Sequence, residues 1–266
     1  MTIPNLSPKA LARTYSSPTH ADPWEAVEDY QQYLDVAARN PDSGSAALAS
    51  KLEMPRGRIR SWQDGSKPDP ARAVEVAEEC GWFRDANSDE FGALNQLVAW
   101  IFSGGSISQP HFAPHFAVDD ETEDRATGAI ETLGLDWRRD RADEPSRATE
   151  IIPTDHASVL GRALSVLGAP VGPKNDRTDL SLPEYLDDAP DGIRAEFVDV
   201  YLRNRAQSHE NKNILTLREE RSDRYLQELA ALVEDTAGEP VTVSDKNVIL
   251  STAAADALYG KLNRPF

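Results

Sequence analysis

Five basic residues crowd a short window near the start of a chain that is otherwise strongly acidic. Residues 51–67 contain five basic and two acidic side chains, a charge of +3, whereas the whole chain carries −17. The planar fork of arginine can bond guanine O6 and N7 together or clamp a phosphate. The window therefore suggests nucleic-acid binding. The candidate DNA-binding residues are Lys51, Arg56, Arg58, Arg60, Ser61 and Lys67.

The basic window falls within a pattern that resembles the helix-turn-helix motif of DNA-binding proteins. Helical spacing predicts helices over Ser45–Glu53 and Gly57–Asp64, although Glu53 stands where the motif often has glycine. In this motif the second helix enters the major groove, so its outward arginines are predicted to face DNA. A three-helix domain used for protein contacts, with solvated arginines, is the alternative. The residues expected to pack the two helices together are Ala49, Leu52, Met54, Ile59 and Trp62.

A second constellation lies at the ends of two apolar helices. Leu97 to Gly105, followed by Ser106-Ile107-Ser108, resembles the signature helix of LAGLIDADG homing endonucleases. The Leu182-Pro183 preface, the Ala189-Pro190 bend and the apolar helix over 194–206 resemble the second repeat of that family. The resemblance covers residues 90–266. It implies two helices paired at a pseudo-twofold axis, each ending in an acid that holds catalytic metal, with saddle-shaped sheets that lie on DNA.

The two metal-binding acids are missing from this sequence. Gly104 stands at the position of the first and Arg205 at the position of the second. Hydrolysis by this route needs carboxylates that hold metal ions, so we expect no metal site, no catalytic residues and no nuclease activity. Arg203 and Arg205 become candidate phosphate contacts. Surface arginines that complement the dipole at the end of a helix are an equally good interpretation.

The elements needed to position these residues predict an α+β protein. An N-terminal all-α helix-turn-helix domain would be followed by a duplicated αββαββα (LAGLIDADG-like) domain, because one order of helices and strands occurs twice. The predicted organisation is a mobile arm over 1–23, the helix-turn-helix domain over 24–84, and repeats over 90–180 and 181–266. The predicted helices of the repeats span 91–102, 120–133, 155–167, 193–204, 222–236 and 251–262.

The acidic composition of the chain bears on whether nucleic acid can be a binding partner. The acidic residues are dispersed, and 21 arginines stand against 7 lysines, which resembles proteins of salt-loving archaea. At molar salt the Debye length is about 3 Å, so distant acids do not exclude nucleic acid.

The longest apolar stretch, Leu97–Phe102, is far short of the roughly 20 residues that span a bilayer, and no signal peptide is recognisable. Cys80 has no cysteine partner. We expect a cytoplasmic protein without membrane partners.

The sequence therefore predicts a sequence-specific protein that binds double-stranded DNA, a transcriptional regulator of an archaeon associated with the nucleoid. The combination of domains resembles, in reverse order, bacterial sporulation regulators. A dimer with a second copy of the chain is a further candidate assembly, and no cofactor or small-molecule substrate is expected. Two alternatives stay open. One is an RNA-binding splicing or maturase-like factor, and the other is a still-active metal-dependent endonuclease.

Overall fold

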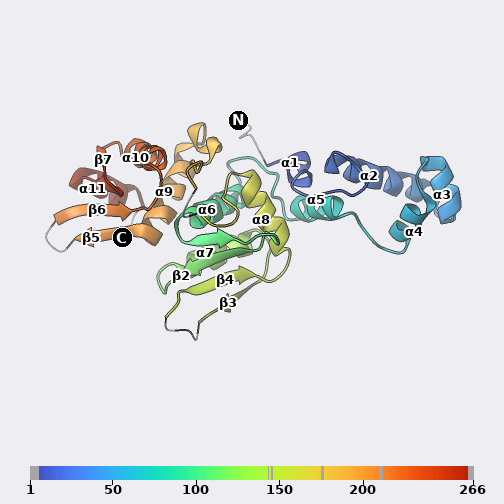
Figure 1. Cartoon of the computed structure of the whole chain (residues 1–266), viewed down its shortest axis with the longest axis horizontal. Coiled ribbons are helices and arrows are strands. Elements are labelled where there is room, and N and C mark those ends of the chain that lie inside the picture. Colours follow the sequence, from blue (N-terminus) through green and yellow to red (C-terminus); the bar gives the residue numbers. More distant parts are fainter. Residues whose placement is uncertain (1–5, 143, 145, 175–176, 210–211, 263–266) are drawn as a thin grey trace. The chain divides into compact units, whose positions relative to one another are not determined.

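The chain folds into two units, each with its own core. The computed structural model describes residues 6–142, 144, 146–174, 177–209 and 212–262. A helical unit spans Leu6–Glu79, and a duplicated unit begins at Cys80, close to the predicted domain end at residue 84 (Figure 1). No helix within the described ranges is both long enough and apolar enough to cross a membrane.

The helical unit packs around an aromatic cluster. The ring centroids of Tyr30 and Tyr33 each lie 5.3 Å from that of Trp62. Ile59, on the same helix as Trp62, is fully buried. The second helix of the predicted motif is thus anchored by the two residues that the sequence identifies. The helices are α1 (Pro8–Ala12), α2 (Pro23–Arg39), α3 (Ser45–Leu52), α4 (Arg56–Gln63) and α5 (Asp69–Glu79).

The predicted mobile arm is wrong where the structure describes it. Residues 8–12 form α1, which packs against α5, and Leu11 and Ala12 are fully buried. The Oγ of Ser7 accepts a hydrogen bond from the amide of Ala10, and proline occupies the first helical position. A serine cap followed by proline is a normal helix start. Residues 1–5 of the arm lie outside the described residues.

A three-residue turn joins α3 to α4, and both helices form where the sequence predicts them. Glu53 adopts a φ of 55°, and the amide of Met54 donates to the carbonyl of Ala49 at 3.1 Å. Glycine adopts this left-handed conformation without steric cost. The backbone at this position therefore favours glycine, and nothing in the structure explains why the chain has Glu53 there.

The duplicated unit contains two copies of one αββαββα order, as predicted. Each copy builds a four-stranded antiparallel sheet, with strand orders β1-β2-β4-β3 and β5-β6-β8-β7. This confirms the α+β class and the duplication. The first copy consists of α6 (Asp89–Ser103), β1 (Gly105–Ile107), β2 (Pro114–Val118), α7 (Glu123–Thr132), β3 (Trp137–Asp140), β4 (Thr149–Pro153) and α8 (Ala157–Val166). The second consists of α9 (Asp191–Arg205), β5 (Ala206–His209), β6 (Lys212–Arg218), α10 (Asp223–Ala237), β7 (Val241–Ser244), β8 (Asn247–Leu250) and α11 (Thr252–Leu262).

The two copies correspond position by position at the ends of α6 and α9. Strand β1 begins directly after Gly104, and β5 begins directly after Arg205. Gly105 then pairs with Phe116, and Ala206 pairs with Leu217, at the same sequence offset in both copies. The sheet register therefore supports the equivalence of Gly104 and Arg205 that the sequence predicts.

Helices α6 and α9 pack against each other and run in the same direction. The amide of Asn95 donates to the carbonyl of Ile193 at 3.0 Å, and further along the pair Asn204 donates to the Oγ of Ser103 at 2.8 Å. Gln96 also donates to Glu196, whose pKa is raised by burial. Because the helices are parallel and in register, their C-terminal ends meet at one place.

We expect Trp62→Ala to unfold the helical unit. Loss of a buried aromatic side chain typically costs about 3 to 5 kcal/mol, and Trp62 is 8% exposed between two tyrosine rings. Thermal unfolding followed by circular dichroism should show an early loss of helical signal. Trp24→Ala is the control, because Trp24 is only partly buried. Equal destabilisation by the two variants would contradict this account of the core.

Candidate nucleic-acid interface

Three of the predicted DNA contacts are exposed on α3 and α4. Lys51 lies near the end of α3, and Arg56 and Arg60 lie one turn apart on α4. Arg60 is 74% exposed and forms an ion pair of 3.8 Å with Asp64, while the Nε of Arg56 donates to the Oγ of Ser45 at 3.4 Å. Exposed contacts of this kind contribute little stability. DNA could replace them at small cost.

The prediction that Arg58 faces DNA is not supported by its position. Its Nη1 donates to the Oδ2 of Asp29 at 2.7 Å, and its guanidinium lies 5.9 Å from the ring centroid of Trp62. The side chain is 22% exposed, and the Nε2 of His20 lies 3.1 Å from the same carboxylate. Arg58 joins α4 to α2 instead of extending outward.

The two remaining candidates of the window are exposed but differ in their partners. The hydroxyl of Ser61 lies 2.6 Å from that of Ser66. Lys67 forms an ion pair with Glu75 of α5, and this hydrogen bond raises the pKa of Lys67. A nucleic acid would have to compete with Glu75 for the ammonium of Lys67.

The structure brings the two positions of the missing acids together at the ends of α6 and α9. A Cβ built on Gly104 would lie 3.5 Å from the side-chain amide of Asn204, the neighbour of Arg205. The Nε of Arg205 donates to the Oε1 of Glu219 at 2.9 Å, and its Nη2 donates to the carbonyl of Arg218 at 3.0 Å. Arg205 is therefore neither a simple surface arginine nor an uncommitted phosphate contact.

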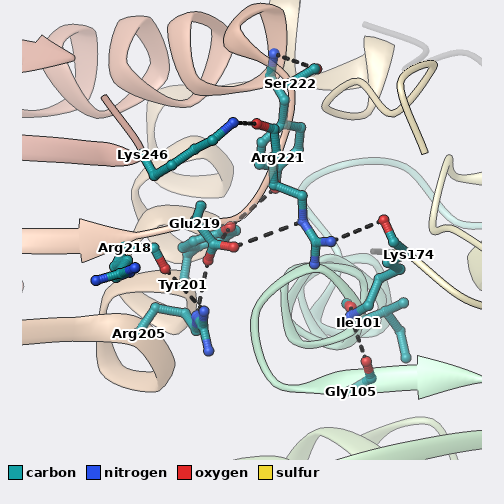
Figure 2. Close-up of polar contacts among 11 residues, drawn as sticks. Ile101, Gly105, Lys174, Tyr201, Arg205, Arg218, Glu219, Arg221, Ser222 and Lys246 are labelled. Carbon is teal, nitrogen blue, oxygen red and sulfur yellow. Dashed lines mark hydrogen bonds and ion pairs between the residues drawn. The ribbon is translucent and has the colours of Figure 1, made fainter. Parts of the chain in front are cut away.

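A lysine from a distant segment reaches the end of α6. The ammonium of Lys174 donates to the carbonyl of Ile101 and, at 2.7 Å, to that of Gly105 (Figure 2). Helix C-termini attract cations because their last carbonyls lack helical partners. Burial first, and then the charge of Arg221, lower the pKa of Lys174 to about 8, although Glu219 opposes the shift. A cation therefore lies at the junction.

One buried carboxylate is at the centre of this cluster of cations. Glu219 is 2% exposed, and its Oε1 accepts from the hydroxyl of Tyr201 at 2.9 Å as well as from Arg205. The Nε of Arg221 lies 3.8 Å from its Oε2, and Arg221 Nη1 donates to the carbonyl of Lys174 at 3.0 Å (Figure 2). Hydrogen bonds and paired cations compensate the burial of a charged group.

Arg203 is also paired with a buried acid. Its Nε lies 2.8 Å from the Oδ1 of Asp199, which is 6% exposed and also pairs with Arg125 of α7. Arg203 itself is 17% exposed. Neither sequence interpretation, a phosphate contact or a surface arginine at a helix end, describes this residue. The ion pair between Arg125 and Asp199 links α7 to α9, and Arg203 shares the same carboxylate.

The residues at the junction do not suit a catalytic metal. Gly104 offers no ligand, Arg205 and Lys174 are cations, and Glu219 already accepts two hydrogen bonds. Within the part of the chain that the structure describes, no group of three His, Cys, Asp or Glu side chains is placed to hold a metal ion. The nearby Asp119 caps the turn before α7, where its Oδ1 accepts from the amide of Thr122 at 3.0 Å.

The outer face of the second sheet differs in charge from that of the first. On the first sheet, Glu150 lies beside His115, 3.0 Å away, and pairs with Arg141. The second sheet packs α10 and α11 against one face. Its other face carries no carboxylate at the positions whose side chains are described. These are Gln207, Ile214, Thr216, Arg218, Thr242, Ser244, Asn247 and Ile249.

Sequence reasoning missed the cations around Glu219. Lys174 lies between α8 and α9, in a segment without helical or strand periodicity, and Arg221 directly precedes the cap of α10. Lys246 lies in the turn between β7 and β8, and its ammonium donates to the carbonyl of Arg221 at 3.0 Å. The scarcity of lysine was the available signal, because two of seven lysines meet at this cluster.

Two solved structures are similar to the chain. The homing endonuclease I-WcaI bound to its DNA recognition sequence has a TM-score of 0.49 and 10% identity, over 75% of this chain and 90% of that one. The N-terminal LAGLIDADG domain of DUF199/WhiA has a TM-score of 0.41 and 12% identity, over 72% of this chain and 95% of that one. No protein-family model and no curated protein sequence matches. At this similarity, function has to be inferred from the chain's own residues.

The lowered pKa of Lys174 predicts a specific dependence of stability on pH. From about pH 8 toward 10.5 the unfolded lysine binds more protons than the folded one, so its contribution to the free energy of unfolding should rise with pH. Urea unfolding at about pH 7 and about pH 9 should therefore show wild type gaining stability relative to Lys174→Met. A difference between the two proteins that stays constant with pH would refute this assignment.

Proposed function

We propose that the chain binds double-stranded DNA sequence-specifically and does not cut it. The proposal rests on three exposed basic residues of α3 and α4, which are Lys51, Arg56 and Arg60. They lie in residues 51–67, whose net charge is +3, while the net charge of the whole chain is −17. The fold does not require this reversal of charge, since none of the three is buried. The contacts that hold α4 in the helical unit come instead from the ion pair of Arg58 and from the buried side chains of Ile59 and Trp62.

In the proposed complex, α4 enters the major groove. Arg56 and Arg60 lie on the same side of this eight-residue helix, so both can reach base edges or flanking phosphates. Ser61 is exposed beside Arg60, and Lys51 lies near the end of the neighbouring helix, where a phosphate would pass. Because Arg58 is held by Asp29, it orients α4 and does not read bases.

The second sheet provides a further surface for DNA in this proposal. Its outer face presents amide, hydroxyl and arginine side chains, with Thr216 and Arg218 alternating with buried leucines along β6. Hydrogen-bonding side chains without carboxylates are suited to a polyanion. We assign no such role to the first sheet, because Glu150 and Asp140 lie on its outer face.

Transcriptional regulation is the use of such a binder that we favour. A protein that recognises a sequence and leaves it intact acts by occupying its site, which places it on the nucleoid. The dispersed acid and the excess of arginine over lysine favour a high-salt archaeal cell. There, binding by phosphate neutralisation alone would be weak, because such affinity falls steeply with salt. Base contacts from α4 would supply the specificity.

Arg60→Gln should weaken DNA binding by about 1 to 3 kcal/mol if Arg60 reads a base. The measurement is fluorescence anisotropy at constant salt, with a duplex selected by the wild-type protein from random sequences. Arg72→Gln is the control, because Arg72 is exposed in the same unit and pairs with Asp69. Equal affinity of both variants for the duplex, or tighter wild-type binding to structured RNA, would contradict the proposal.

Incubation with plasmid DNA and Mg²⁺ or Mn²⁺ should leave the plasmid uncut, because neither Gly104 nor Arg205 can hold a metal ion. The readout is conversion of supercoiled to nicked or linear plasmid over hours, with a commercial nuclease as positive control. Cleavage that Asp119→Asn or Asp199→Asn abolishes would show that the chain is an active nuclease with displaced acids.

A further inference from the structure

An open pocket of about 720 Å³ lies beside the end of α9 in the duplicated unit. Four cationic side chains line it, Arg177, Arg205, Arg221 and Lys246, together with the hydroxyl residues Thr178 and Ser222. Two carboxylates, Glu219 and Glu220, complete the lining. The pocket is built from the end of α9, the segment after β6, the β7–β8 turn and the segment that precedes the second repeat. Figure 2 shows Arg205, Arg221 and Lys246 from the first three of these.

The carboxylates do not neutralise the cations. Glu220 is 70% exposed and pairs at 3.3 Å with Arg218, which is outside the lining. Among the described residues that line the pocket, Glu219 is the only buried acid. The ammonium of Lys174, outside the lining, interacts electrostatically with Glu219 as well. Arg177 pairs at 3.0 Å with Asp179 at the edge. Burial first, and then the charges of Arg221 and Arg205, lower the pKa of Lys174, while Glu219 raises it.

Donors remain available within the pocket. Arg221 is 10% exposed, and its Nε is buried 3.8 Å from the Oε2 of Glu219. Its Nη1 donates one hydrogen bond to the carbonyl of Lys174, which leaves further N–H groups on its two Nη atoms. The contacts of Arg205 with Glu219 and with the carbonyl of Arg218 use two of its five N–H groups. Lys246 donates one hydrogen bond, to the carbonyl of Arg221, from an ammonium with three donors. These groups come from three different segments of the chain.

We propose that this pocket binds a phosphate group, held by Arg205, Arg221 and Lys246. Guanidinium groups match the paired oxygens of phosphate, and charge-assisted hydrogen bonds are the strong ones. The excess positive charge excludes a divalent cation. The sequence resemblance to homing endonucleases implies negative charge and a metal ion near Arg205, whereas the charge of this pocket is positive. The inference does not rest on DNA binding by α4, because the pocket belongs to the other unit.

The test uses inorganic phosphate and the full chain. Line broadening of the phosphorus-31 signal, titrated at about pH 7 in constant sodium chloride, measures binding. We expect wild type to broaden the signal and Lys246→Gln and Arg205→Gln each to weaken binding about tenfold, the loss of one charge-assisted hydrogen bond. Arg224→Gln is the matched control, because it removes one charge near the start of α10 from a residue that pairs with Glu228 outside the pocket.

Equal broadening by wild type, Lys246→Gln and Arg205→Gln would overturn the proposal, as would no broadening at all. Lys246 lies in a turn and is only partly buried, so we expect Lys246→Gln to fold. This variant therefore tests the proposal even if Arg205→Gln misfolds. Circular dichroism checks both variants.

Addition of duplex DNA distinguishes the source of the phosphate. Displacement of inorganic phosphate from the wild-type protein by the duplex identifies a backbone phosphate. Phosphate that stays bound at saturating duplex identifies a free phosphate or a phosphorylated small molecule. Arg60→Gln should retain phosphate binding in either case, so failure of the DNA proposal and failure of this one are separable.

Discussion

The packing of α6 against α9 is the contact on which the duplicated unit depends. Hydrogen bonds from Asn95 to Ile193 and from Asn204 to Ser103 fix the two helices in parallel register. Each helix leads directly into the first strand of its sheet, so their register places both sheets. It also brings the two C-terminal ends, with their free carbonyls, to one place, and such ends attract cations.

In this chain the compensating charge is part of the protein itself. Lys174 binds the end of α6, and Arg205 takes the position at the end of α9 where the family resemblance implies an acid. One carboxylate, Glu219, cannot balance these cations together with Arg221 and Lys246. The result is a region of positive charge in a chain whose net charge is −17. The outer face of the second sheet also has no carboxylate at its described positions. Both features favour a phosphate-bearing partner.

The sequence could predict the order of elements because local patterns determine it. Apolar periodicity located every helix of both repeats, and Gly104 and Arg205 were recognised as equivalent. The helix start at Ser7-Pro8 is a local signal too, but the sequence-based prediction for residues 1–23 is a mobile arm. Side-chain pairing could not be predicted, because Arg58 and Asp29 are distant in sequence, as are Lys174 and Ile101. Exposure of a charged residue depends on such partners and not on its own helix alone.

Two crystals, one soaked in manganese chloride and one in sodium phosphate, test the central claim, that the pocket beside the end of α9 binds phosphate and the junction of α6 and α9 holds no metal. We expect tetrahedral density against Arg205, Arg221 and Lys246, and no anomalous manganese peak near Gly104. A manganese peak between Gly104 and Arg205, with no phosphate in the pocket, would contradict the account.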